Sequence, residues 1–291
     1  MKKRMIGLAL LVVIMLVTGG IYMAAGRTPQ IITVDGYVGG EKIELLEDEE
    51  VQAILEEDYG VKADYSRAGS LDMMTADMDG MDYLFPSSSI AEEYYEDLHG
   101  SPEQSEIVLN TPIVLYTHQA VLDAFDSQGL ITSSGNSYYI DMTKLVELIR
   151  NDTSWADIGL PELYGNISVD TTDPARSNSG NMFAALLANV LNGGQTLTQE
   201  NLQTILPQLQ DIFGKLGYME TSSSDLFSQF LRMGIGAKPV IAGYESQLIE
   251  YAALYPDQYE TMKDDIVMLY PTPTVWSTHV FIALDADGQV L

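Results

Sequence analysis

The sequence predicts an α/β fold of two lobes joined by a hinge, preceded by one N-terminal transmembrane helix. Three observations lead to this prediction. Short apolar strands alternate with amphipathic helical stretches along most of the chain, as in α/β folds. Two extended segments pass through prolines, near residues 110 and 271, and resemble the two strands of a hinge. An uncharged run, Met5–Ala25, follows the basic cluster Lys2-Lys3-Arg4.

The run Met5–Ala25 is expected to hold the chain in the membrane, and we assign residues 1–28 to a signal anchor. It has 21 residues without a charge, and roughly 20 apolar residues span a bilayer core. A cleaved signal peptide is the alternative, but the small-x-small cleavage site is poor, since Met23 lies two residues before Ala25. Either way the basic cluster stays in the cytoplasm and the rest is exported. The expected location is the cell membrane, single-pass, with the bulk of the chain extracytoplasmic.

The first lobe is expected to comprise residues 29–110 and 272–291. Its longest helix is predicted from the helical spacing of Val51, Ile54 and Leu55, and Gly60 suits the end of that helix. The predicted elements are a strand at 31–36, a helix at 47–59, a strand at 61–65, a short helix at 71–79, a strand at 83–86, a helix that runs to 98 and a closing strand at 275–284.

The second lobe is expected to comprise residues 111–271, entered through the apolar extended stretch 107–117. Pro112 lies inside this stretch, which argues for an edge or a crossing between lobes. The predicted elements are helices at 142–150, 155–158, 180–191, 198–216, 224–233 and 246–255, and strands at 166–171, 238–243 and 266–270.

Composition excludes several classes of function. The 42 acidic side chains outnumber the 14 basic ones, so the surface repels nucleic acid and we expect no nucleic-acid partner. The chain has no cysteine, which excludes disulfides, thiolate metal ligands, cysteine nucleophiles and a lipidated cysteine. Hydrophobic residues make up 46% of the chain, enough to bury real cores.

Four turns between a strand and a helix carry small, hydroxylated or glycine residues: 35–42, 66–70, 172–180 and 243–246. Ligands of open α/β sheets bind where strands end and helices begin, because helix starts offer unpaired N–H groups. The third turn is the strongest candidate, since it adds the guanidinium of Arg176 to several small polar side chains. For the first two turns a plain turn or a helix cap explains the residues equally well, and Tyr244 in the fourth could pack against a neighbouring strand.

Taken in order, these segments resemble the type II periplasmic binding proteins, especially the molybdate- and sulfate-binding branch, over most of residues 30–285. The segments that carry the resemblance are Ala68-Gly69-Ser70, Asp82–Ser87, Asn110–Thr117, Asp173-Pro174 followed by Ser179-Gly180, and Ala242–Ser246. The resemblance implies a two-lobed type II fold in which serines, backbone N–H groups and a tyrosine hold a ligand. Gly39-Gly40 departs from the family, which has a hydroxyl there, and this leaves the identity of the anion open.

The resemblance and the turns together nominate ten ligand-binding residues: Gly39, Gly40, Ser70, Ser88, Arg176, Ser177, Asn178, Ser179, Tyr244 and Glu245. The expected ligand is a small solute, with an oxyanion as one candidate. A neutral polar or cationic ligand stays open, with Glu245 or Asp173 as its partner. We expect no metal site and no cofactor.

The resemblance implies capture of a small solute between the lobes and delivery to an ABC permease. A membrane-tethered sensor or adaptor with the same fold is the alternative. An extracytoplasmic hydrolase fits less well, and we predict no catalytic residues. Histidine is the commonest general base, and the only ones are His99, His118 and His279, in no catalytic motif; Gly-x-Ser-x-Gly and His-Glu-x-x-His sequences are absent.

Overall fold

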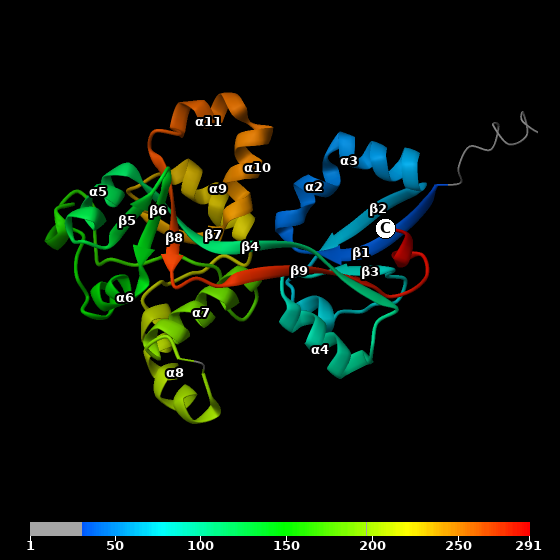
Figure 1. Cartoon of the computed structure of the whole chain (residues 1–291), viewed down its shortest axis with the longest axis horizontal. Helices are drawn as coiled ribbons and strands as arrows, with labels where there is room; N and C mark the ends of the chain where they lie inside the picture. Colours follow the sequence, from blue (N-terminus) through cyan, green and yellow to red (C-terminus); the bar gives the residue numbers. More distant parts are fainter. Residues whose placement is uncertain (1–30, 196) are drawn as a thin grey trace, which may run out of the picture.

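The computed structural model describes residues 31–195 and 197–291. These residues form an α/β structure with one group of helices and strands at each end and two strands, β4 (Gln104–His118) and β9 (Trp276–Ala283), running between them (Figure 1). No helix in these two ranges is both long and apolar enough to cross a membrane. The predicted transmembrane helix at 1–28 lies outside the described residues.

The sheet of the first lobe has the strand order β2-β1-β3-β9-β4. β1 pairs in parallel with both β2 and β3, whereas β9 is antiparallel to β3 and to the first half of β4. The strands are β1 (Ile32–Val38), β2 (Val61–Arg67), β3 (Tyr83–Phe85), β4 (Gln104–His118) and β9 (Trp276–Ala283).

Alternating burial along β1 explains why this segment is a strand. Val34, Gly36 and Val38 are buried, and the residues between them are partly exposed, which is the period of two that a half-buried strand requires. Gly36 is needed because a Cβ there would lie 2.5 Å from the carbonyl oxygen of Tyr83. The aromatic ring of Tyr83 therefore packs directly on the backbone of β1.

The helix predicted at 47–59 is present from Glu49 to Tyr59, with its last five residues in a π turn and a separate short helix before it. Asp48 adopts an extended conformation and its carboxylate accepts hydrogen bonds from the N–H groups of Glu50 and Val51, so a new helix begins there. Gly60, at φ 68°, ends the last turn as predicted. The helical segments of this lobe are η1 (Gly40–Lys42), α2 (Ile43–Glu47), α3 (Glu49–Ile54), the π turn η2 (Leu55–Tyr59), η3 (Asp72–Met74), α4 (Ser89–His99) and η5 (Gly288–Val290).

β4 passes from one sheet to the other at Pro112. Up to Pro112 it pairs with β9, and from Ile113 it pairs with β7 (Val240–Tyr244) and β8 (Ile266–Thr272). The chain returns through residues 273–275, and the N–H of Ile113 donates to the carbonyl oxygen of Val275 over 3.0 Å. The two crossings thus lie side by side near the two prolines that the sequence singles out. The lobe boundaries 29–110, 111–271 and 272–291 themselves stay a prediction.

The second lobe is built on β7, β4, β8 and a hairpin that the sequence did not predict, β5 (Ile131–Ser134) and β6 (Ser137–Asp141). Gly135, at φ 60°, makes the hairpin turn. The helical segments are α5 (Gln119–Ser127), α6 (Met142–Arg150), η4 (Ala156–Ile158), α7 (Asn178–Leu191), α8 (Gln199–Gly214), α9 (Ser223–Met233), α10 (Glu245–Leu254) and α11 (Pro256–Met262).

The strand predicted at 166–171 is wrong. Asp170 forms an isolated parallel bridge to Ile241, with its N–H bonded to the carbonyl of Val240 and its carbonyl bonded to the N–H of Ala242. Pairing stops after this one residue and the chain turns at Asp173-Pro174. α5 and α11 were also not predicted. α11 begins at Pro256, a favoured first helical residue, directly after α10.

The largest core lies in the second lobe, where helices α5, α6 and α7 cover the sheet. The rings of Phe125 and Trp155 are 6.0 Å apart there, and neither side chain is more than 2% exposed. Buried aromatic rings stabilise the folded state because they remove a large apolar area from water and pack closely against their neighbours.

We expect Phe125→Ala to lower the free energy of unfolding by about 3–5 kcal/mol, because it removes a buried ring and leaves a cavity. Urea unfolding followed by tryptophan fluorescence measures this, since Trp155 is adjacent. The control is Tyr164→Ala, whose side chain is 99% exposed, with an expected change within about 0.5 kcal/mol. Equal effects of the two substitutions would contradict the assigned core.

Candidate ligand-binding site

A polar cavity of about 380 Å³ lies between the two lobes. The first lobe contributes the turn after β1, the turn after β2 and Ser87, and the second lobe contributes the segments before α7, α9 and α10. The lining residues are Gly39, Gly40, Glu41, Arg67, Ala68, Gly69, Ser70, Asp72, Ser87, Arg176, Ser177, Asn178, Thr221, Ser222, Ser223, Asp225 and Tyr244.

Two long helices of the second lobe begin at the cavity without a side-chain cap. Ser177 and Ser222 are the N-cap residues of α7 and α9, and neither hydroxyl accepts a hydrogen bond from a backbone N–H of its own helix. Instead the Ser177 hydroxyl contacts the Ser179 hydroxyl at 3.1 Å, and the Ser222 hydroxyl contacts that of Ser224 at 2.8 Å. The first-turn N–H groups are therefore available to a ligand, and the positive ends of both helix dipoles favour an anionic group.

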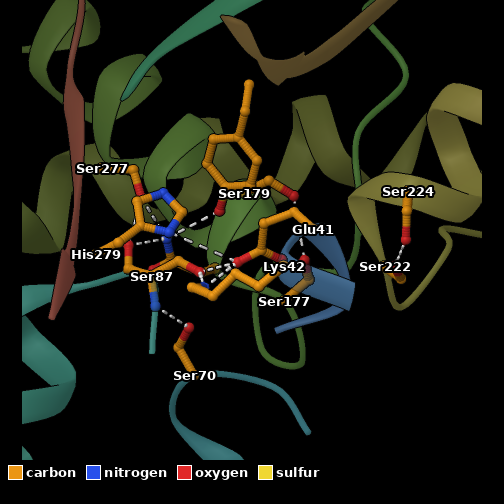
Figure 2. Close-up of polar contacts among 12 residues, drawn as sticks. Glu41, Lys42, Ser70, Ser87, Ser177, Ser179, Ser222, Ser224, Ser277 and His279 are labelled. Carbon is orange, nitrogen blue, oxygen red and sulfur yellow. Dashed lines mark hydrogen bonds and ion pairs between the residues drawn. The ribbon is translucent and has the colours of Figure 1, made fainter. Parts of the chain in front are cut away.

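Glu41, which lines the cavity on the first-lobe side, forms an ion pair with Lys42 (Figure 2). Lys42 Nζ lies 2.5 Å from Glu41 Oε1 and 2.7 Å from Ser87 Oγ, and the Ser87 hydroxyl also donates to Glu41 Oε1. The side chains of Lys42 and Glu41 are 2% and 9% exposed. The ammonium also lies 4.8 Å from the centre of the Phe85 ring, a cation–π contact.

The ionisation of this pair follows from its surroundings. Burial opposes the charged form of Glu41, but the charge of Lys42, the neighbouring His279 and hydrogen bonds from Lys42 and Ser87 outweigh it and lower the pKa of Glu41 to about 2. Burial lowers the pKa of Lys42, and Glu41 opposes that shift. Glu41 is thus a fixed negative charge at neutral pH.

His279 lies behind this pair on β9. Its side chain is 1% exposed, neither ring nitrogen has a hydrogen-bond partner among the described residues, and its Nδ1 is 3.9 Å from Glu41 Oε1. Burial and the charge of Lys42 lower the pKa of His279 to about 3, although Glu41 opposes this. The ring is therefore neutral at pH 7, and the contact with Glu41 is not an ion pair there.

Asn178, in the first turn of α7, joins the lobes at the back of the cavity. Its amide nitrogen lies 2.7 Å from the carbonyl oxygen of Ser87 and 3.0 Å from Ser277 Oγ, both on the first-lobe side. The same nitrogen lies 3.0 Å from the Tyr244 hydroxyl. Burial, followed by the charge of Glu41, raises the pKa of Tyr244, so its hydroxyl stays protonated.

The lobes also meet at the mouth of the cavity. Arg67 of β2 forms an ion pair of 2.9 Å with Asp225 of α9, and both side chains are well exposed. Two glycines of the first lobe allow this approach: a Cβ on Gly69 would lie 2.5 Å from the carbonyl oxygen of Arg176, and one on Gly40 would lie 2.9 Å from Arg67 Nε and 3.1 Å from Ser222 Oγ. The structure is therefore a closed arrangement of the two lobes.

Seven of the ten nominated residues line this cavity together: Gly39, Gly40, Ser70, Arg176, Ser177, Asn178 and Tyr244. The other three lie outside its lining. Ser88 caps α4 by accepting from the N–H of Ile90, Ser179 is buried with its hydroxyl 2.7 Å from that of Thr172, and the carboxylate of Glu245 accepts from the Tyr270 hydroxyl. These three side chains are hydrogen-bonded to other residues, so the geometry does not favour direct contact between them and a ligand.

Sequence reasoning missed several lining residues: Glu41, Arg67, Asp72, Ser87, Thr221, Ser222, Ser223 and Asp225. The run Thr221-Ser222-Ser223 has the same hydroxyl-rich character as the nominated turns, and it precedes a helix that was predicted. No strand precedes it, so a search for turns between a strand and a helix does not find it. The buried pair of Glu41 and Lys42 has no signal in the sequence, since adjacent opposite charges are common on surfaces.

Comparison with solved structures shows many chains of similar fold. The sulfate-binding protein SubI from Mycobacterium tuberculosis H37Rv superposes with a TM-score of 0.56 at 13% identity, covering 89% of this chain and 79% of that one. The periplasmic binding protein AfuA from Actinobacillus pleuropneumoniae, with fructose-6-phosphate bound, superposes with a TM-score of 0.55 at 13% identity. The match covers 89% of this chain and 77% of AfuA. The periplasmic molybdate-binding protein of Azotobacter vinelandii superposes with a TM-score of 0.50 at 12% identity. The match covers 88% of this chain and 90% of that protein.

The chain has the fold of the type II periplasmic binding proteins. The resemblance stated from the sequence is confirmed at the level of the fold. No protein-family model matches the chain, and no curated protein matches it either. Sequence identities of 12–13% support a shared fold and nothing more, so the ligand has to be inferred from the residues of the cavity.

The low pKa of Glu41 predicts a loss of stability in acid. A carboxyl whose pKa is lowered by folding, here from 4.5 to about 2, contributes stability that is complete above pH 4.5 and is lost as the pH falls toward 2. We expect the stability difference between the wild type and Glu41→Met combined with Lys42→Met to shift against the wild type as the pH falls from about 5 toward 2. The lowered pKa of Lys42 changes this difference on the alkaline side, where the wild type gains stability as the pH rises.

Urea unfolding at a series of pH values from 7 to 2.5 measures this difference. His279 also weakens the fold as the pH falls from 6.5 toward 3, because the unfolded chain takes up a proton that the folded one resists. Burial, the largest cause of this low pKa, is kept in both proteins, so the main part of the His279 effect is shared; only the smaller contributions of Lys42 and Glu41 differ between them. A difference that does not change with pH would show that Glu41 is not held ionised by its neighbours.

Proposed function

We propose that the chain is an extracytoplasmic solute-binding protein that captures a small anionic solute between its two lobes for uptake by an ABC-type transporter. The observation that carries the proposal is the pair of uncapped helix starts, at Ser177 and Ser222, that open on one cavity between the lobes. Arg67 and Arg176 add two guanidinium groups to the same lining. Helix starts and guanidinium groups both favour oxyanions and carboxylates.

The similar structures support the general role. Those proteins bind sulfate, fructose-6-phosphate and molybdate, and each of these ligands is or carries an oxyanion group. Anchoring through residues 1–28, by an uncleaved helix, is part of the proposal and rests on the uncharged run in the sequence alone. A tethered sensor with the same cavity would differ only in its partner protein.

The cavity offers binding groups rather than a catalytic arrangement. None of His99, His118 and His279 is among its lining residues. Its serines bond to neighbouring hydroxyls, to Glu41 or to backbone groups, and no serine in the lining contacts a histidine within the described residues. A hydrolase would need an activated nucleophile or water, which these contacts do not provide.

Closure of the lobes should depend on Gly69. We expect Gly69→Ala to weaken anion binding at least about tenfold. In the closed state the new Cβ would clash with the backbone of Arg176, which cannot rotate away as a side chain could. Isothermal titration with a panel of sulfate, molybdate, phosphate and small organic anions measures the affinity. The free energy of unfolding without ligand should change by no more than about 0.5 kcal/mol.

Gly236→Ala is the matched control, since a Cβ there meets nothing within 4 Å and its φ is not positive. Equal affinities of the Gly69 and Gly236 variants would contradict closure over the ligand. Failure of the wild-type protein to bind any anion of the panel would contradict the proposed function itself.

A carboxylate placed at the start of α7 should compete with the ligand. We expect Ser177→Asp to weaken anion binding at least about tenfold, because the new side chain caps the helix and brings a like charge into the cavity. The same capping should leave the fold as stable as before or more so. Thr198→Asp is the control, because Thr198 is an exposed N-cap of α8 and does not line the cavity. Unchanged binding by the Ser177 variant would show that the anion lies elsewhere.

A further inference from the structure

One oxygen of Glu41 is left without a partner in the wall of the cavity. The contacts of Lys42 and Ser87 are all made to Oε1, whereas Oε2 has no hydrogen bond to any residue that the structure describes. The carboxylate is packed on Gly39, where a Cβ would lie 2.4 Å from Oε1 and 2.7 Å from Oε2. Because the side chain is 9% exposed and fixed on one side, its free oxygen is a built acceptor (Figure 2).

A fixed acceptor in this position selects among anions. Sulfate and molybdate carry only acceptor oxygens when fully deprotonated, so their oxygens would face Glu41 with no hydrogen between them. A buried carboxylate that loses its hydrogen-bonding water without a new donor is destabilised by desolvation. The ligand that suits this wall therefore brings a hydrogen-bond donor as well as an acidic group.

The size of the cavity points the same way. At about 30 Å³ per molecule of liquid water, a cavity of about 380 Å³ has room for on the order of a dozen waters. An inorganic tetrahedral oxyanion has only five heavy atoms and would leave most of this space unfilled. A small organic molecule fits it better.

The charges of the lining favour a neutral donor over a second cation. Glu41 is already paired with Lys42, and Asp225 is already paired with Arg67. Asp72 and Arg176 add one charge of each sign to the lining, so no net negative charge is left for a second cation to balance. Much of the remaining polar lining consists of hydroxyl groups, which both donate to and accept from other hydroxyl groups. These are Ser70, Ser87, Ser177, Thr221, Ser222, Ser223 and Tyr244.

We infer that the ligand is a hydroxylated organic anion, whose acidic group lies at the starts of α7 and α9 and whose hydroxyl donates to Oε2 of Glu41. This inference rests on the proposed function and names its substrate class. Glu41 is then the residue that determines specificity: it rejects bare inorganic oxyanions and accepts molecules such as phosphorylated, sulfonated or carboxylated polyols.

Matched probes test the inference on the unmodified full chain by isothermal titration. The pairs are glycerol 3-phosphate with propyl phosphate, isethionate with ethanesulfonate, and glycerate with propionate, each compared with sulfate and molybdate. We expect at least one hydroxylated probe to bind about tenfold or more tightly than its hydroxyl-free partner and than either inorganic anion, as a hydrogen bond to a charged group provides.

The possible failures are distinct. Sulfate or molybdate binding as tightly as every hydroxylated probe, or hydroxyl-free probes binding as tightly as their partners, would overturn the inference and leave the proposed function standing. No binding by any of the eight anions would overturn both.

A variant assigns the preference to Glu41. Glu41→Met with Lys42→Met removes both charges together, so no lone charge stays buried. We expect it to retain binding of the hydroxyl-free probe while the roughly tenfold preference for the hydroxylated one disappears. Lys215→Met with Asp152→Asn, which removes an ion pair away from the cavity, should keep the preference. A preference that persists without Glu41 would overturn its role, and the probe pairs on the wild type decide the ligand class even if the double variant does not fold.

Discussion

The shared strand β4 is the constraint on which the site depends. Its first half belongs to the sheet of one lobe and its second half to the sheet of the other, and the return crossing at residues 273–275 is hydrogen-bonded beside it. Residues 31–195 and 197–291 cross between the lobes at just these two adjacent places, so the lobes can rotate about one line while each sheet keeps its strand pairing. The turns that follow β1 and β2 in one lobe and the starts of α7 and α9 in the other therefore face the same gap.

Within that gap, charge is compensated locally. The charge of Lys42 balances that of Glu41 in the first-lobe wall of the cavity, and the charge of Arg67 balances that of Asp225 at the mouth of the cavity. The two pairs differ in kind. The buried pair holds its geometry through Ser87 and depends on both partners, because either charge alone would be costly to bury. The exposed pair bridges the lobes and is screened by salt, so it can open when the lobes separate.

The net charge of −28 does not decide what the cavity binds. Exposed charges are screened beyond about 8 Å at physiological salt, whereas helix starts and guanidinium groups act on a ligand at contact. A strongly acidic protein can thus hold an anion, provided that the contact groups are donors. The unpartnered oxygen of Glu41, Oε2, then carries information about the ligand that the overall charge does not.

The sequence by itself determined the α/β class, the helix starts and the two proline-marked crossings, since these follow from short-range periodicity, capping residues and backbone restrictions. It also predicted seven of the residues that line the cavity, because the turns that follow strands converge in this class of fold. Only the tertiary structure decided that residues 166–171 form two isolated bridges rather than a strand, and that Ser88, Ser179 and Glu245 are engaged elsewhere. It alone revealed the burial of Glu41 with Lys42 and its contact with Ser87, 46 positions along the chain. Burial and long-range pairing depend on how distant segments pack, and no local pattern records that.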